Sequence, residues 1–299
     1  MLTRRAGSSP AFRTFNPGRD SCRGFFVVTM QQPFLWIPIG ALVAGAIAVG
    51  AFRARFLTRS GAWAAFALGA IVFGLGGLQF SIPLIVFFTL SSLLSVYGPK
   101  RWKEVKERLG QVFEKGGTRD AWQVWANGGI AGIIVILYVI QPHECIFVAY
   151  LGALAAAAAD TWGTELGVLS RGRTISARTF RTVEPGVSGG ISAVGTLGAA
   201  AGAASVALSG MYWSAAPRSV LGVAILAGLA GMLADSLTGA ILQARYRCVR
   251  CHGITERRFH CDRSAKLVAG RPWVTNDLVN TVCCIVGASL AYLLCTALS

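Results

Sequence analysis

Eight apolar stretches of about 20 residues dominate this chain, and each is long enough to cross the roughly 30 Å hydrocarbon core of a bilayer. Only 14% of its 299 residues are charged, against about a quarter in an average soluble domain. We therefore predict an all-α, polytopic integral membrane helix bundle with about eight transmembrane helices. They lie near residues 34–52, 61–79, 81–98, 122–140, 144–166, 186–211, 217–242 and 277–298. The second and third are so close that they predict a tight hairpin at residues 79–83 or a re-entrant segment.

The positive charges are distributed asymmetrically along the chain. If the helices alternate in direction, the linkers on one side hold 22 of the 28 Lys and Arg residues, and those on the other side hold only Arg218. This asymmetry obeys the positive-inside rule, so we expect a multi-pass protein of the cell inner membrane with its basic linkers in the cytoplasm. The net charge of +15 then follows the topology, and we expect no nucleic-acid partner.

Residues 1–33 hold five further arginines, which this topology would place outside. A translation start at Met30 would remove all five and lead directly into the first span. A transit peptide is the alternative, and it would place the protein in an organelle membrane. We therefore treat residues 1–33 as a tail outside the core. Residues 34–299 are expected to form one transmembrane catalytic domain, with a cytoplasmic Cys/His loop at 245–271.

Polar residues gather at the cytoplasmic ends of the predicted spans. An aspartate near the middle of a membrane helix costs roughly 2.5–3.5 kcal/mol and less toward the interface, so such groups usually face a cavity or a partner. One interpretation is that these groups are wet and interfacial, and pair with nearby Arg171 or Arg245. The other is a site for a metal ion and phosphate. The residues of this layer include Asn127, Asp160, Glu165, Asp235, Ser236, Asn276, Asp277 and Asn280.

Helical spacing separates the two acids of the fifth span. With 100° per residue, Asp160 shares a face with Gly163, Thr164, Gly167 and Arg171. Small residues there leave a groove between an acid and a base. Glu165 lies about 140° away from Asp160, so one straight helix does not aim both at the same ion. We therefore expect Glu165 to serve a neighbouring helix or a second ion.

The fourth, sixth and eighth predicted spans all begin on the cytoplasmic side. Their free backbone N–H groups and positive dipole ends then face the acidic layer, which favours phosphate binding. Ser188, Gly189 and Gly190 lie at the expected start of the sixth span and would cradle phosphate. Carboxylates beside them would hold Mg²⁺. These parts suit a nucleoside triphosphate bound beside an anionic lipid head group, although no Walker A sequence occurs.

Five ordered segments carry a family resemblance: "QVWANGG", "AAADTWGTELGVLS", "EPGVSGGISAVGTLG", "GMLADSLTGAILQ" and "NDLVN". They resemble the signatures of the domain of unknown function 92 family, integral membrane proteins that include the plant phytyl-phosphate kinase and transmembrane protein 19. The resemblance runs from about residue 35 to the C-terminus. It implies CTP-dependent phosphorylation of a prenyl monophosphate to the diphosphate, as in the plant member.

A looser similarity links "DTWGTELG" to the D-x-x-A-x-x-x-G pattern of polyprenol kinases and CDP-diacylglycerol synthases, with Gly163 in place of Ala. The lysine-rich signature of the synthases is absent after Asp235, where Gly239 and Ala240 follow. A CDP-lipid-forming cytidylyltransferase is therefore the less favoured alternative. A secondary transporter that uses the intramembrane acids is another, although transporters usually bind at the midplane and show repeats.

A prenyl phosphate is already an anionic nucleophile, so its phosphorylation needs positioning and charge neutralisation more than a strong base. Asp160 and Asp235 would hold Mg²⁺ on the CTP, with Glu165 and Asp277 as further catalytic ligands or orienting groups. The expected partners are the lipid bilayer, a nucleoside triphosphate and a prenyl phosphate; no pattern indicates an oligomeric state. The residues expected to bind the nucleotide and its phosphates are Asn127, Thr164, Arg171, Ser188, Gly189, Gly190, Ser236, Asn276 and Asn280.

The loop "CVRCHGITERRFHC" carries a second motif. Cys248-x2-Cys251 followed by His260 and Cys261 predicts a tetrahedral zinc set, with His252 as a substitute ligand. Four protein ligands leave no open position, so a zinc ion here would be structural. The alternative is a reduced cytosolic cysteine cluster. The cysteines of the predicted spans are expected to be packing residues and not a disulfide scaffold; they are Cys145, Cys283, Cys284 and Cys295.

Overall fold

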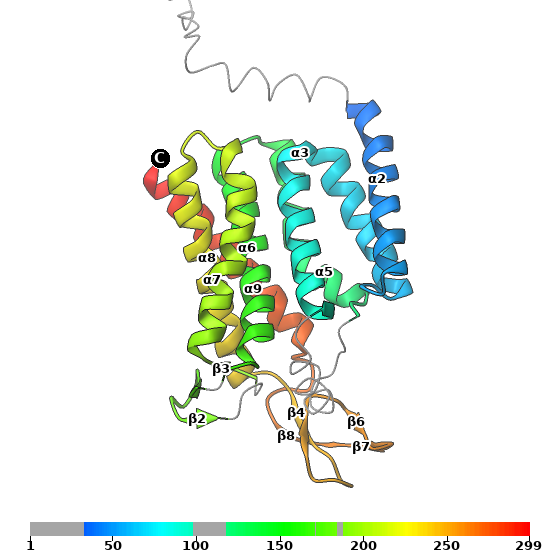
Figure 1. Ribbon diagram of the computed structural model, residues 1–299, viewed down its shortest axis with the longest axis vertical. Helices are drawn as coiled ribbons and strands as arrows, with labels where there is room; N and C mark the ends of the chain where they lie inside the picture. The colour runs from blue at the N-terminus through cyan, green and yellow to red at the C-terminus, as the bar shows by residue number, and fades with distance from the viewer. Residues whose placement is uncertain (1–32, 98–117, 171, 184–187) are drawn as a thin grey trace, which may run out of the picture.

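The computed structural model describes residues 33–97, 118–170, 172–183 and 188–299. Within these ranges, seven helices are long and apolar enough to cross a membrane, and they pack into one bundle (Figure 1). This confirms the predicted all-α membrane bundle. The helices are α2 (Pro33–Arg53), α3 (Arg59–Tyr97), α5 (Ala121–Ile140), α6 (Glu144–Gly167), α7 (Ala193–Gly210), α8 (Pro217–Ile241) and α9 (Asn276–Leu298), with a short 3-10 turn η1 (Met211–Trp213) after α7.

Helix α3 is a hairpin of two helices, so the bundle contains the eight apolar segments that the sequence predicts (Figure 1). The chain reverses at Gly77, whose φ of 65° lies in the left-handed region that glycine adopts without steric cost. The turn therefore precedes the predicted position at 79–83. Ser81 Oγ donates to the Gly77 carbonyl at 2.7 Å. Phe80 packs edge-on against the rings of Phe147 and Tyr150 in α6, which anchors the hairpin to the bundle.

Helix α6 lies at the centre of the bundle and contacts α3, α5, α7, α8 and α9. Its alanines at 155–159 are buried on all sides. Because alanine is the smallest residue with a Cβ, the neighbouring backbones approach closely: a Cβ added at Gly202 of α7 would lie 2.6 Å from the Ala158 carbonyl oxygen. A Cβ added at Gly228 of α8 would lie 3.0 Å from that of Ala155. The alanine run thus places Asp160, the residue that follows it, in the middle of the bundle.

All described strands lie at one end of the bundle (Figure 1). The segment between α6 and α7 forms a sheet of order β2-β1-β3, and the segment between α8 and α9 forms a sheet of order β5-β4-β8 and a hairpin of β6 and β7. The predicted Cys/His loop is therefore a small β-module. The strands are β1 (Thr174–Ser176), β2 (Thr182–Val183), β3 (Gly190–Ile191), β4 (Arg245–Arg247), β5 (Ile254–Thr255), β6 (Phe259–His260), β7 (Arg263–Ser264) and β8 (Lys266–Ala269).

The predicted start of the sixth span is wrong. Helix α7 begins at Ala193, where the Ser192 hydroxyl accepts a hydrogen bond from the Gly195 backbone N at 3.1 Å and caps the helix. Ser188 and Gly189 form a turn, and Gly190 begins β3. The pairing of β3 with β1 occupies this segment, so these three residues do not offer a helix N-terminus.

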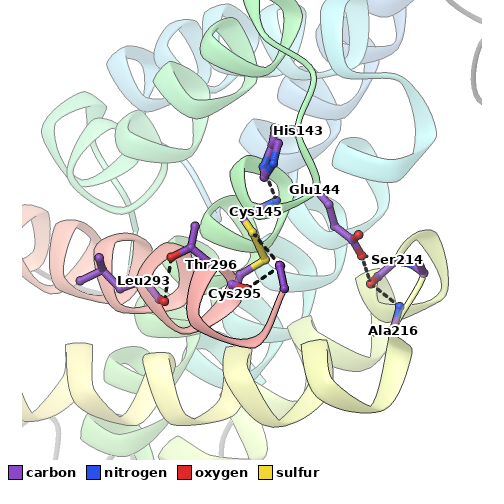
Figure 2. The surroundings of a disulfide bond; sticks show 10 residues. His143, Glu144, Cys145, Ser214, Ala216, Leu293, Cys295 and Thr296 are labelled. Carbon is purple, nitrogen blue, oxygen red and sulfur yellow. Dashed lines mark hydrogen bonds between the residues drawn. A yellow bond between two sulfur atoms is a disulfide. The ribbon is translucent and has the colours of Figure 1, made fainter. Parts of the chain in front are cut away.

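The interpretation of Cys145 and Cys295 as packing residues is also wrong, because a disulfide joins them (Figure 2). Cys145 lies in the first turn of α6 and Cys295 in the last turn of α9, and α6 and α9 pack together. Glu144, beside this bond, accepts a hydrogen bond from the Ser214 hydroxyl (Figure 2). It also accepts one from the Ala215 backbone N. The bond thus fixes the end of the bundle opposite the strands.

Candidate functional site

Two carboxylates from different helices meet inside the bundle. The side chains of Asp160 in α6 and Asp235 in α8 lie within hydrogen-bonding reach of each other. One turn earlier, Gly231 of α8 packs against Ala156 of α6, where an added Cβ would lie 2.5 Å from the Ala156 Cβ. Both helices run toward the strand end (Figure 1). Asp160 follows Ala156 by four residues, and Asp235 follows Gly231 by four residues. The small size of Ala156 and Gly231 therefore determines how close the two carboxylates lie.

Helix α9 adds an amide to this pair. Asn280 is 8% exposed. With its amide nitrogen turned toward the pair, it donates to Asp235 Oδ1 at 3.3 Å and to the Asn276 carbonyl oxygen at 3.2 Å. The structure thus brings Asp160, Asp235 and Asn280 together from three helices that the sequence separates. Asp277 lies three residues before Asn280, in the first turn of α9, which Thr275 caps.

Glu165 faces a neighbouring helix, as the helical spacing predicts. Ser95 Oγ, in the second arm of α3, donates to Glu165 Oε1 at 2.6 Å. The guanidinium of Arg119 also lies near Glu165. Burial lowers the pKa of Arg119 to about 10, and the charge of Glu165 opposes that shift. Arg119 therefore stays charged at neutral pH. Its carbonyl and N–H bond the loop between α2 and α3, which fixes the position of this residue.

Sequence reasoning missed Arg119 and Glu256 as site residues. Arg119 was one of many basic linker residues, with no feature that set it apart. Glu256 lies between β5 and β6, is 9% exposed, and is close enough to Asp235 for their charges to interact. A signal for Glu256 was present, because it is the one acid between Cys251 and His260 in the sequence.

The turn at 188–190 packs against α8 beside the acid pair. Ser188 Oγ donates to Gln243 Oε1 at 2.8 Å. Gly189 has a φ of 78°, and a Cβ added there would lie 2.7 Å from the Ser236 carbonyl oxygen. Close approach to α8 therefore requires this glycine. Ser188, Gly189 and Gly190 therefore lie near the acid pair, as predicted, but they form a turn and the start of a strand and not a helix N-terminus.

The remaining predicted residues occupy separate positions. Thr164 is exposed. Ser236 turns its hydroxyl toward Met232 Sδ of its own helix, at 3.9 Å. The Asn127 side-chain amide donates to the Gln123 backbone carbonyl, and the Asn127 backbone carbonyl accepts from Cys284 Sγ of α9. Arg171 lies outside the described residues. Further from the bundle, the predicted zinc ligands Cys248, Cys251, His260 and Cys261 come together in the β-module.

An apolar cavity of about 70 Å³ lies between α2, α3 and α5. Its walls include Ala48, Leu68 and Phe87. Its polar lining comes chiefly from Arg119, Gln123 and Asn127, near the start of α5. Arg119 therefore links the cavity to Glu165, and the charge of Glu165 in turn acts on Asp160. The apolar cavity thus has a cation, Arg119, in its lining, and this cation lies near an acid of the candidate site.

Comparison with known proteins supplies the family. The model of the integral membrane protein family DUF92 matches residues 42–288. The chain belongs to this family. The resemblance found in the sequence segments is confirmed, and the chain is an integral, multi-pass membrane protein.

Among curated proteins, the chain is similar to Protein PGR of Arabidopsis thaliana, with 31% identity over 237 residues that cover 71% of this chain and 81% of the relative. It is also similar to the uncharacterized membrane protein MJ0933 of Methanocaldococcus jannaschii, with 31% identity over 220 residues that cover 73% of this chain and 88% of the relative. Protein VTE6, chloroplastic, of Arabidopsis thaliana is 22% identical over 243 residues, which cover 80% of this chain and 65% of the relative. No solved structure matches.

Proposed function

We propose that this protein is a membrane-embedded prenyl-phosphate kinase, which transfers the terminal phosphoryl group of CTP or another nucleoside triphosphate to a prenyl monophosphate. The observation that carries this proposal is the carboxylate pair of Asp160 and Asp235, together with an apolar cavity whose polar lining includes Arg119, a residue near Glu165. An acceptor with an isoprenoid chain and a phosphate head group needs an apolar cavity for the chain and a positively charged residue for the phosphate. The sequence resemblance to a family with a plant phytyl-phosphate kinase supports the same activity.

The acid pair suits Mg²⁺. This cation takes oxygen ligands, and usually binds one or two carboxylates together with substrate phosphates. Asp160 and Asp235 would supply those carboxylates, with the Asn280 amide orienting Asp235. Because Glu256 and Glu165 add negative charge on either side, a cation would relieve the repulsion among these acids. When bound, Mg²⁺ would neutralise charge on the triphosphate.

Arg119 suits the phosphate of the acceptor. Arg119 lines the cavity and remains charged at neutral pH. It would therefore bind the phosphate head group while the isoprenoid chain packs against the apolar walls of the cavity. A phosphate oxygen of the acceptor then attacks the γ-phosphorus. The new P–O bond forms as the bond from that phosphorus to the β–γ bridging oxygen breaks, and a nucleoside diphosphate leaves. No strong base is needed, since the attacking oxygen already carries charge.

We propose that the strand end of the bundle faces the cytoplasm. The basic linkers that the structure describes lie at this end and the disulfide of Cys145 and Cys295 lies at the other, which matches an oxidising compartment outside. A membrane-impermeant maleimide applied to intact cells should therefore label Ala215→Cys and spare Arg178→Cys, since both positions are exposed at opposite ends. The reverse labelling would refute this orientation.

The decisive assay uses the purified protein in detergent with Mg²⁺, labelled CTP and a panel of prenyl monophosphates. Transfer of label from the γ position to a prenyl diphosphate is the expected result, and Asp160→Asn should abolish it. Label from the α position in a CDP-lipid would indicate the cytidylyltransferase instead. If no donor and acceptor react, the kinase proposal fails, and ion flux in proteoliposomes would then test the transporter alternative.

A further inference from the structure

The β-module between α8 and α9 buries little apolar surface. Apart from Tyr246 of β4, its larger apolar side chains are exposed, among them Val249, Ile254 and Phe259. The buried residues are few and mostly polar or sulfur-bearing, such as Cys248, Thr255 and Glu256. A segment of this size without apolar burial usually needs a metal or a disulfide to stay folded. All three of its cysteines are free thiols.

The four candidate ligands have the geometry of a metal site. The sulfur atoms of Cys248, Cys251 and Cys261 and a ring nitrogen of His260 all lie within 4.8 Å of one another. His260 Nδ1 lies 3.2 Å from Cys261 Sγ and 3.5 Å from Cys251 Sγ. In a tetrahedral zinc site with Zn–S of about 2.3 Å and Zn–N of about 2.1 Å, the nitrogen–sulfur edge is about 3.6 Å. The observed separations fit ligands of one ion.

The backbone at both ligand pairs supports the same arrangement. Arg250 N donates to Cys248 Sγ at 3.4 Å, and the His252 N–H closes a turn onto the Cys248 carbonyl at 3.0 Å. Cys261 and Asp262 have φ values of 52° and 57°, as in a two-residue turn between β6 and β7. Non-glycine residues adopt this left-handed region only at an energetic cost. Metal coordination would offset that cost.

We propose that Cys248, Cys251, His260 and Cys261 bind one structural Zn²⁺, and that this ion holds the fold of the β-module that carries the buried Glu256. Three thiolates and an imidazole are the donors that zinc prefers, and a full set of four leaves no position for catalysis. Glu256 lies between the two ligand pairs in the chain, and its charge acts on Asp235. The place of Glu256 therefore depends on the zinc ion that holds the two ligand pairs together. This inference does not depend on the kinase proposal.

Metal analysis of the purified full-length protein tests the first half. We expect about one zinc per chain after purification, and near zero for Cys251→Ser. His252→Asn is the matched control, because His252 adjoins Cys251 and asparagine tolerates its φ of 59°; it should retain full zinc. Reconstitution with Co²⁺ should give the absorption of a tetrahedral thiolate site. Wild-type protein that takes up neither metal in metal-replete medium would overturn the assignment, as would zinc loss in His252→Asn with retention in His260→Ala.

Hydrogen exchange tests the second half without any turnover. Chelation of zinc should raise amide exchange in residues 246–269 at least tenfold, while the core of α6 stays protected. Exchange around Glu256 that is unchanged after zinc removal would refute the claim that zinc holds this segment in place. Metal content and hydrogen exchange are both measured without substrate. A protein that binds zinc as expected but shows no kinase activity would therefore contradict only the kinase proposal.

Discussion

Substitution of Gly231 by alanine should separate the two carboxylates without touching either. An added Cβ would lie 2.5 Å from Ala156 Cβ and 2.8 Å from the Cys283 carbonyl oxygen. Carbon atoms in contact are about 3.5–4.0 Å apart, so α8 has to move by roughly 1 Å relative to α6. Asp160 and Asp235 follow one turn after these contact residues, and the displacement would reach both.

The expected cost has two parts. Overpacking a well-packed interface destabilises by about 1–3 kcal/mol, which lowers an apparent Tm by roughly 3–10 °C. A misplacement of about 1 Å at a reacting centre costs on the order of 100-fold in rate. Thermal unfolding in detergent measures the first part, and γ-phosphoryl transfer at saturating Mg²⁺ measures the second.

Gly222 provides the matched control in the same helix. A Cβ added there meets nothing within 4 Å, and both substitutions gain the same helix propensity of about 1 kcal/mol. The difference between Gly231→Ala and Gly222→Ala therefore reports the contact with α6. Equal Tm values and equal rates for the two variants would refute the view that small residues set the approach of the acids.

Three further results are expected. Asp235→Asn should lower kcat at least 100-fold and raise the Mg²⁺ concentration for half-maximal rate, because it removes a carboxylate of the pair; an unchanged Mg²⁺ titration would count against this role. Arg119→Gln should raise the KM for the prenyl phosphate about tenfold or more, a loss of about 1.4 kcal/mol, whereas Arg119→Lys should recover part of it, and an effect on the KM for nucleotide alone would contradict the assignment. Reduction of the Cys145–Cys295 disulfide should lower stability by about 2–4 kcal/mol, seen as a fall in Tm with reductant that the double serine variant does not show; an equal fall in both would point to another thiol.

Helical periodicity predicted much of the acidic site. Asp160 and Glu165 were assigned to different faces of one helix, and Glu165 does face Ser95 on a neighbouring helix. The clustering of Cys248, Cys251, His260 and Cys261 was also predictable, because their spacing is short and local turns bring them together. These successes share a cause: each depends on residues within a few turns of one another.

Other features depended on contacts between distant segments. Arg119 had no signal among the basic linker residues, and Glu256 reaches Asp235 only because the β-module folds back toward α8. The disulfide joins residues separated by 150 positions. The glycines before α7 looked like a helix start, but strand pairing of Gly190 with β1 delayed that start. Pairing with a partner strand is not visible in a single segment.

Hydrophobic length determined the membrane bundle from the sequence alone, since the cost of burying charge in hydrocarbon acts on each segment independently. Charge asymmetry predicts the direction of the bundle in the membrane. The sequence also determined which helices carry acids. Only the tertiary structure decided which acids meet, because helix register is set by side-chain size at interfaces such as Ala156 against Gly231. The sequence places a carboxylate in a given helix, whereas the packing of the helices places it beside a second carboxylate.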